Sequence, residues 1–238
     1  MSGEIEIGWC TKKVENYFFD YRRRESLKTF YGEFDQKPQF FYCPPVVDFL
    51  KNTYGYYSAS KVNVFHENGK LHVLQGHQHA FLAEENGEPN YRQLIIDEDH
   101  SLEYRFPDEI FISDTPGVKI QLMPHPKSKY QNIVCAELDI YKWFRSFHCP
   151  YYFNGDQFHL MLDEDEPLFI IKFITPNDET VKLVELDYSK IEKYADQRRR
   201  MRILTGENIR SYKWWKNTFD VFANKRPKNM IDYARIDK

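Results

Sequence analysis

The chain has 238 residues, a formal charge of −3 at pH 7, 42% hydrophobic residues and 29% charged residues. These values are typical of a folded globular protein and exclude an extensively disordered, collagen-like or coiled-coil chain. No run of 18 apolar residues occurs, so no transmembrane helix is expected, and the polar, acidic N-terminus does not resemble a secretory signal. We therefore expect a soluble protein that is not secreted through a signal peptide.

Aromatic residues are abundant, with 19 Phe, 17 Tyr and 4 Trp, whereas Ala occurs only seven times. Aromatic side chains favour strands and Ala favours helices, so this composition predicts a mainly β fold.

Short apolar or alternating runs, bounded by turn residues, recur along residues 1–188. The first is EIEIGW at 4–9. Residues 38–50 are apolar but contain Pro44 and Pro45, so we expect an edge strand, a bulge or a crossing between sheets there. Later strands are predicted at 102–106, 109–113, 118–124, 133–140, 150–154, 157–162, 168–175 and 180–186.

Residues 62–74 carry the clearest hairpin pattern, because Asn68-Gly69 favours a type I′ turn and is flanked by alternating apolar residues. In the register that this turn sets, Glu67 lies opposite Lys70, Phe65 lies opposite His72, and Val64 shares a face with Val73. Hairpin turns are also predicted at 154–155, 163–166 and 176–178.

From Ser189 the apolar period becomes helical. Ser189 and Glu192 form a possible capping box, followed by an apolar stripe up to Leu204, and a second stripe covers 209–222 before Pro227. The charge changes sign at the same place. Residues 1–188 carry 19 Lys and Arg and 30 Asp and Glu, a net of −11, and residues 189–238 carry 14 and 6, a net of +8.

These patterns predict a β-sandwich, jelly-roll-like, with two C-terminal amphipathic helices. We expect an acidic sandwich domain at 1–188 and a basic helical segment at 189–238 that packs on it.

Three stretches carry a family resemblance: YCPPVVDFLKNTYGYYSAS at 42–60, LDIYKWFRSFHCPYYF at 138–153 and DEPLFIIKFITPNDETVKLVEL at 165–186. Over about residues 38–222 the chain resembles an uncharacterised family found in tailed phages, notably marine T4-like ones, and in some bacteria. The resemblance implies a β-sandwich with C-terminal helices and a phage origin, hence a location in the host cytoplasm or the virion. It implies no activity and no functional residue.

GHQHAFLAEE contains a candidate metal motif. His77, His79 and Glu84 give H-x-H-x4-E, which looks like the first metal motif of the cupin superfamily. Two His at i and i+2 on a strand point the same way, and a carboxylate can complete a face that suits Fe(II) or another divalent metal. Cupins usually add a later His; here the only candidate is His125, in a Pro-His-Pro loop that comes later than the family pattern has it.

Other chemistry is less well supported by the sequence. The four cysteines form no CxxC pair, and we expect reduced, mostly buried thiols. His148-Cys149 with His159 could suggest a Cys/His nucleophile, but a buried Cys explains it better. Basic clusters at 22–24 and 198–202 interleave with aromatic residues, yet an acidic body repels phosphates, so nucleic acid is not expected as a partner.

The sequence therefore favours a non-catalytic binding or assembly module, an accessory or virion-associated phage protein whose partner is another protein or a second copy of itself. The alternative is a cupin-like, metal-dependent oxygenase that uses His77, His79 and Glu84, with His125 as a fourth ligand.

Overall fold

The computed structural model describes residues 3–11, 24–26, 39–58, 61–67, 70–73, 82–85, 88–91, 94–97, 101–142, 147–152, 157–192, 194 and 227–236. All structural statements below concern these residues. For 24–26, 40–41, 66–67, 70–73, 82–85, 88–91, 94–97, 101–108, 147–150 and 157–158 they concern the backbone alone.

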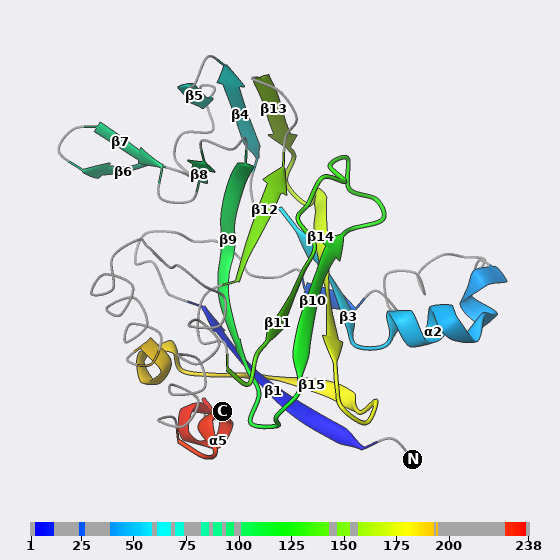
Figure 1. The fold of residues 1–238 in the computed structure, drawn as a ribbon. Helices are drawn as coiled ribbons and strands as arrows, with labels where there is room; N and C mark the ends of the chain where they lie inside the picture. Colours follow the sequence, from blue (N-terminus) through cyan, green and yellow to red (C-terminus); the bar gives the residue numbers. More distant parts are fainter. Residues whose placement is uncertain are drawn as a thin grey trace, which may run out of the picture.

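Two five-stranded sheets form the body of the molecule (Figure 1). β1 and β15 pair in parallel, and the other strand pairs are antiparallel. Sheet A has the order β12-β9-β1-β15, with β8 also beside β9, and comprises β1 (Glu4–Thr11), β8 (Leu94–Asp97), β9 (Ser101–Ile112), β12 (Phe147–Tyr152) and β15 (Thr180–Glu185). Sheet B has the order β11-β10-β14-β3-β2 and comprises β2 (Arg24–Ser26), β3 (Thr53–Tyr57), β10 (Lys119–Pro124), β11 (Ala136–Asp139) and β14 (Pro167–Ile174). The predicted mainly β, sandwich-like class is confirmed.

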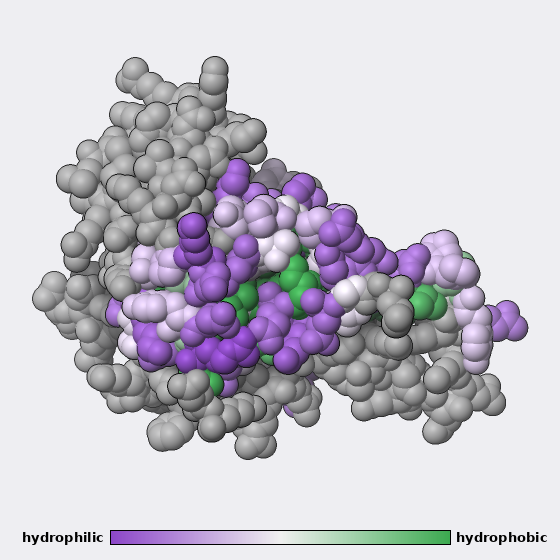
Figure 2. Space-filling model, turned by 90° about the horizontal axis from the view of Figure 1, so that it is seen from below, coloured by the Kyte–Doolittle hydropathy of each residue, from purple (hydrophilic) through white to green (hydrophobic). Residues whose placement is uncertain are grey.

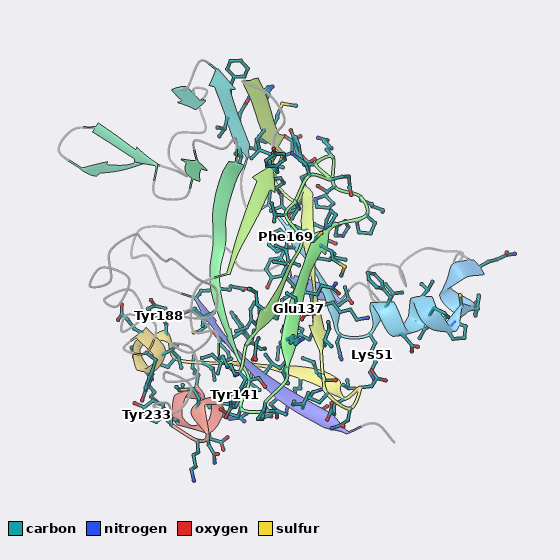
Figure 3. All side chains as sticks on the ribbon, viewed as in Figure 1. Lys51, Glu137, Tyr141, Phe169, Tyr188 and Tyr233 are labelled. Atoms are coloured by element: carbon teal, nitrogen blue, oxygen red, sulfur yellow. The ribbon has the colours of Figure 1, made fainter. Side chains whose placement is uncertain are left out.

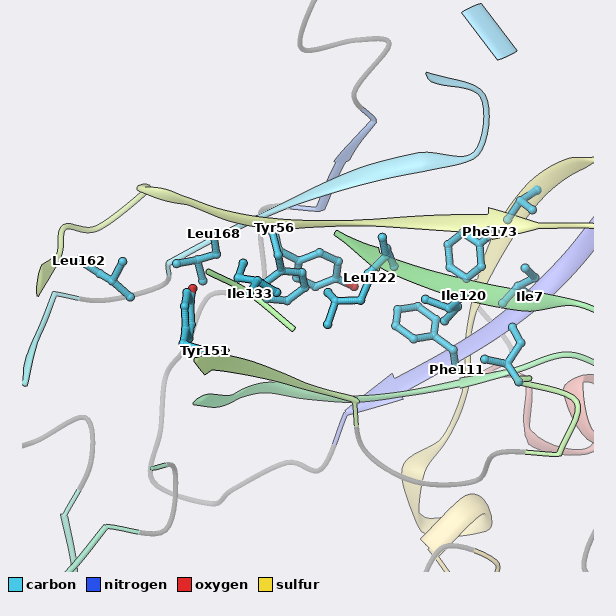
Figure 4. Packing of buried hydrophobic residues seen from close by; sticks show 14 of the residues in the cluster. Ile7, Tyr56, Phe111, Ile120, Leu122, Ile133, Tyr151, Leu162, Leu168 and Phe173 are labelled. Atoms are coloured by element: carbon cyan, nitrogen blue, oxygen red, sulfur yellow. The ribbon is translucent and has the colours of Figure 1, made fainter. Parts of the chain in front are cut away.

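The main core lies between the two sheets (Figure 4). On β14 the alternating residues Phe169, Ile171 and Phe173 are buried towards sheet A. The Phe169 ring stacks on Tyr56 with ring centroids 4.7 Å apart, and Phe111 of sheet A meets Phe173 edge to face at 5.4 Å. Burying a large apolar side chain such as Phe stabilises the fold by about 1.5–3 kcal/mol. The aromatic residues buried in this core are Tyr56, Phe111, Tyr151, Phe169 and Phe173.

A second apolar cluster covers the outer face of sheet A. Residues 188–192 are helical, and α5 (Met230–Ala234) packs beside them. Figure 3 shows Tyr188 and Tyr233 on this side of the molecule, away from Phe169 in the sandwich interior. The cluster comprises Cys10, Ile110, Ile112, Val184, Leu186, Ile191, Met230, Ile231 and Ala234. The two faces of sheet A are therefore both buried in this region.

The outer face of sheet B carries a helix where the sequence predicted a strand. Residues 38–50 were expected as an edge strand or crossing, but the chain forms η1 (Gln39–Tyr42) and α2 (Pro44–Leu50). The prolines stand at the first two helical positions, where no backbone N–H is needed, so they start the helix. Leu50 packs on Ile170, the outward residue of β14. Seen from below, the described surface is mostly hydrophilic with small apolar areas, one of them on the side where α2 lies (Figure 2).

The predicted hairpin at 62–74 is confirmed in its register. β4 (Val62–Glu67) pairs with β5 (Lys70–Val73), and Glu67 faces Lys70, Phe65 faces His72 and Val64 faces Val73. On its other side β4 pairs with β13 (Gln157–Leu162) in a third sheet, sheet C, of order β13-β4-β5. β6 (Leu82–Glu85) and β7 (Glu88–Tyr91) form a separate antiparallel pair.

Sheet C continues sheet B, because β3 runs into β4 and β13 runs into β14. Across the join Ser58 N–H donates to Glu166 O at 2.9 Å, and Asp165 N–H donates to Ser58 O at 2.8 Å. The acidic run at 163–166 was predicted as a hairpin turn, but it is a bend within one long antiparallel ribbon. That prediction is wrong because β13 pairs with β4 and β14 with β3, not with each other.

The other predicted hairpin turns also join strands that do not pair with each other. β14 and β15 lie on either side of the turn at 176–178, and they belong to different sheets. β12 and β13 likewise belong to different sheets, so 154–155 does not close a hairpin, although these two residues themselves lie outside the described part of the chain. The turn residues therefore predicted where the chain turns, but they did not predict which strands pair with each other.

The helix at 188–192 begins one residue before the capping residue that the sequence predicted, Ser189. Its first helical residue is 188, and the Asp187 carboxylate accepts the Ser189 N–H at 2.9 Å, so Asp187 is the cap in place of Ser189. The rest of the two predicted helical stripes falls in 195–226, outside the described residues. α5 follows Pro227 and was not predicted. Within the described part, no helix has the length and apolarity that crossing a membrane requires.

Candidate functional site

The predicted metal ligands are only partly covered by the structure. His77 and His79 lie outside the described residues, and Glu84 is described by its backbone in β6. His125 is described in full and is completely buried. The H-x-H-x4-E metal site therefore stays a prediction. Of the four predicted ligands, only His125 has a side chain that the structure describes.

His125 follows the end of β10 and packs under β3. Its Nδ1 accepts the Lys127 N–H at 3.1 Å, and its ring lies 5.6 Å from that of Tyr57. Gly55 of β3 leaves the space that the imidazole fills, since a Cβ there would lie 3.3 Å from His125 Cδ2 and Nε2. Burial, with a smaller contribution from the charge of Lys127, lowers the pKa of His125 from 6.5 to about 4. His125 is thus a neutral core side chain that holds the loop after β10.

The structure also tests the other candidate chemistry. In the described part of the chain, no group of three or more His, Cys, Asp or Glu side chains is arranged to hold a metal ion. His159 Nε2 lies 2.6 Å from Asn63 Oδ1 on the exposed face of sheet C. The side chains of His148 and Cys149 are outside the description, so their pairing with His159 stays untested.

The cysteines are less uniformly buried than predicted. Cys10 is buried beneath the helical layer, and burial raises the pKa of its thiol to about 12, with smaller effects from Glu109 and Asp187. Cys43 and Cys135 are exposed, so the prediction of mostly buried thiols is wrong for these two. A thiol with a raised pKa is mainly protonated near neutrality, and Cys10 is therefore a poor nucleophile.

The acidic run contains one buried carboxylate. Glu166 is 7% exposed, and its Oε2 accepts the Asp163 N–H at 3.0 Å and pairs with Lys129 Nζ at 3.2 Å. Glu164 and Asp165 face solvent. Because the inward carboxylate is paired inside the bend, this run stabilises the ribbon and does not form a cation site.

Sequence reasoning missed a polar pair in the sandwich core. The Tyr56 hydroxyl of β3 donates to Glu109 Oε2 of β9, and both residues are at least 96% buried. The pair joins sheet B to sheet A. Its one sequence signal is the alternation of EIFIS, in which Glu109 shares a face with Phe111, a core residue.

Segment 128–134 closes one side of the sandwich between β13 and β12. The Tyr130 hydroxyl donates to Met161 O at 3.1 Å and accepts Met161 N–H at 2.7 Å, which connects the segment to β13. Ile133 then forms a bridge with Tyr151 of β12, and Tyr152 N–H donates to Asn132 O at 2.9 Å. The segment therefore seals the sandwich where two sheet edges meet.

Three large apolar side chains are exposed along this seal: Val134 at 43%, Met161 at 45% and Tyr152 at 49%. They come from the segment and from each of the two strands that it joins, and we call them the edge patch. The backbones of Met161 and Tyr152 are held by the hydrogen bonds described above. The edge patch thus consists of three exposed apolar side chains that come from three separate parts of the chain.

The comparisons with known proteins add no relative. No family model, no curated protein and no solved structure matches the chain. The basic clusters at 22–24 and 198–202 are also outside the described side chains. The functional conclusion therefore rests on the residues and surfaces of this chain.

Proposed function

We propose that the protein is a non-catalytic binding or assembly module that uses the edge patch to contact a protein partner. The observation that carries this proposal is the exposure of Val134, Met161 and Tyr152 on the segment and the two strands that it joins by hydrogen bonds. Tyr and Met are enriched at protein interfaces relative to the rest of the protein surface.

The surroundings of the patch support a binding role. Helices pack on the outer face of sheet A and on that of sheet B, whereas the edge patch belongs to segment 128–134 and the two strands that it joins. A surface supported by two sheets can present side chains without rearranging on contact, which reduces the entropy lost on binding. The resemblance to a phage family favours a role within the virion or as an accessory to it.

The test compares two variants in which each substituted residue becomes a glutamate. Tyr152→Glu/Met161→Glu introduces charge into the edge patch, and Val47→Glu on α2, where Val47 is 44% exposed, is the matched control. Tagged proteins are purified from cells that naturally express the chain, and the binding constant of any retained protein is then measured with purified components. We expect the double variant to weaken binding at least about tenfold and the control to bind as wild type.

Equal binding by all three proteins would contradict the edge patch as the contact surface. Circular dichroism and thermal unfolding of each variant separate loss of binding from loss of fold.

A further inference from the structure

Strand edges are the surfaces through which sheets pair with other chains, and most described edges of this molecule are protected. On β15, Val181 N–H donates to Asn52 Oδ1 at 2.9 Å, and Ile236 N–H donates to Glu185 O at 3.4 Å. Side chain and C-terminal backbone therefore occupy both ends of that edge.

The remaining described edges are covered, short or charged. The edge of β12 is covered by Asn132 and Ile133. β11 has four residues, including Glu137 and Asp139, and β5 has four and begins with Lys70. β2 has three residues, of which the first two are charged. Charged residues and short length are the usual protection against edge-to-edge pairing.

β13 is neither short nor charged, and among the described residues only Tyr130 bonds to its outer edge, at Met161. It has six residues, QFHLML, with no charged residue and no proline, and it pairs with β4 over its whole length without a bulge. Leu160 and Leu162 are buried, whereas His159 and Met161 are exposed. β13 is therefore a regular, uncharged strand at the outside of sheet C.

The backbone of β13 shows which groups face outward. The N–H and C=O of Met161 both bond to the Tyr130 hydroxyl, so they point away from β4. Alternate residues of a strand point to the same side, so the backbone groups of Gln157 and His159 point outward as well. Among the described residues, no donor or acceptor meets the backbone groups of His159 on that side.

We propose that β13 pairs antiparallel with β13 of a second copy of the chain, about a two-fold axis at Phe158. In this register Gln157 of each copy faces His159 of the other, and each facing pair exchanges two backbone hydrogen bonds. The outward N–H and C=O of Met161 already bond to the Tyr130 hydroxyl, so the pairing between the two copies ends before Met161. The two copies of sheet C would form one continuous six-stranded sheet.

The charge of the strand selects a second copy as the occupant. In a two-fold antiparallel pair each residue faces itself or a near neighbour in its own sequence, so a charged strand would bring like charges together. β13 carries none, whereas the edges of β2, β5 and β11 do. Self-pairing through β13 is a contact separate from the edge patch and goes beyond the proposed function.

Analytical ultracentrifugation over a range of concentrations tests the pairing. We expect wild type and His159→Ala to dimerise, and His159→Pro to be monomeric, because proline removes one outward N–H that β4 does not use. Gln157→Lys/His159→Lys places like charges opposite each other and is expected to weaken the dimer at least about tenfold. Gln157→Lys/His159→Glu places opposite charges in register and is expected to restore it.

A monomeric wild type, or a His159→Pro variant that still dimerises, would overturn the pairing. The charge variants keep all backbone donors, so they decide the question if the proline variant does not fold. A monomeric wild type that binds another protein through the edge patch would leave the proposed function intact and remove only this inference. A dimer that survives Gln157→Lys/His159→Lys unchanged would show that the contact lies elsewhere.

Discussion

His125 is a single residue whose burial makes the stability of the fold depend on pH. Its folded pKa is about 4, against an ordinary value of 6.5, because burial disfavours the charged imidazole. The unfolded chain therefore takes up this proton at a higher pH than the folded protein does. The stabilising contribution is fully present above pH 6.5 and is lost as the pH falls towards 4.

We therefore predict that unfolding free energy falls between pH 6.5 and 4 with a contribution of up to about 1.4 kcal/mol per pH unit from His125. In His125→Asn, an amide oxygen can still accept the Lys127 N–H but no imidazole titrates. Urea unfolding at several pH values should give a shallower slope for this variant than for wild type. Equal slopes would show that His125 is not the titrating group.

At the scale of secondary-structure elements, α5 depends on a carboxylate from a distant loop. Asp114 Oδ1 accepts Met230 N–H at 3.0 Å and Oδ2 accepts Ile231 N–H at 2.9 Å, so one side chain caps the first turn. A five-residue helix is not stable alone, and this cap with the apolar contacts of Met230 and Ile231 accounts for its position.

Removing the cap in Asp114→Ala should lower the unfolding free energy by about 1 kcal/mol, because two helical N–H groups lose their acceptor. Asp232→Ala is the control, since this carboxylate is 70% exposed and should change stability by no more than about 0.5 kcal/mol. Chemical denaturation measures both variants. A similar loss in the two would argue against capping by Asp114.

The same scale shows what could be predicted from the sequence. The hairpin at 62–74 was predicted in its register because a two-residue turn determines which residues face each other. The pairing of β13 with β4 and of β14 with β3 could not be predicted. The paired strands lie about a hundred residues apart, and no local sequence pattern indicates which distant strand will pair. α2 was missed because two prolines are read as strand breakers although they also begin helices.

For the candidate site the limits are similar. His125 could be identified as a residue of interest, but its burial under Gly55 depends on β3, which is far away in the sequence. The edge patch could not be predicted, because only tertiary structure brings its three segments together.

At the scale of the whole molecule, the Tyr56–Glu109 hydrogen bond joins the two sheets through an otherwise apolar core. A buried carboxylate that loses a donor costs more than the hydrogen bond itself contributes. We predict that Tyr56→Phe lowers the unfolding free energy by about 1–3 kcal/mol, measured by chemical denaturation. Tyr42→Phe, at a side chain that is 74% exposed, should leave it nearly unchanged, and equal effects would contradict the role of the pair.

The parallel pairing of β1 with β15 has a consequence for how the chain folds during synthesis. Glu6 and Lys182 form an ion pair across 176 residues of sequence, and Glu6 and Arg235 form one across 229. β1 is made before both of its neighbours, β9 and β15, and gains the second of them only after residues 180–185 have been made. Contacts this distant in sequence slow folding, since much loop entropy is lost before they form. β1 is thus enclosed on this side only late in synthesis, and its open edge needs protection in the meantime.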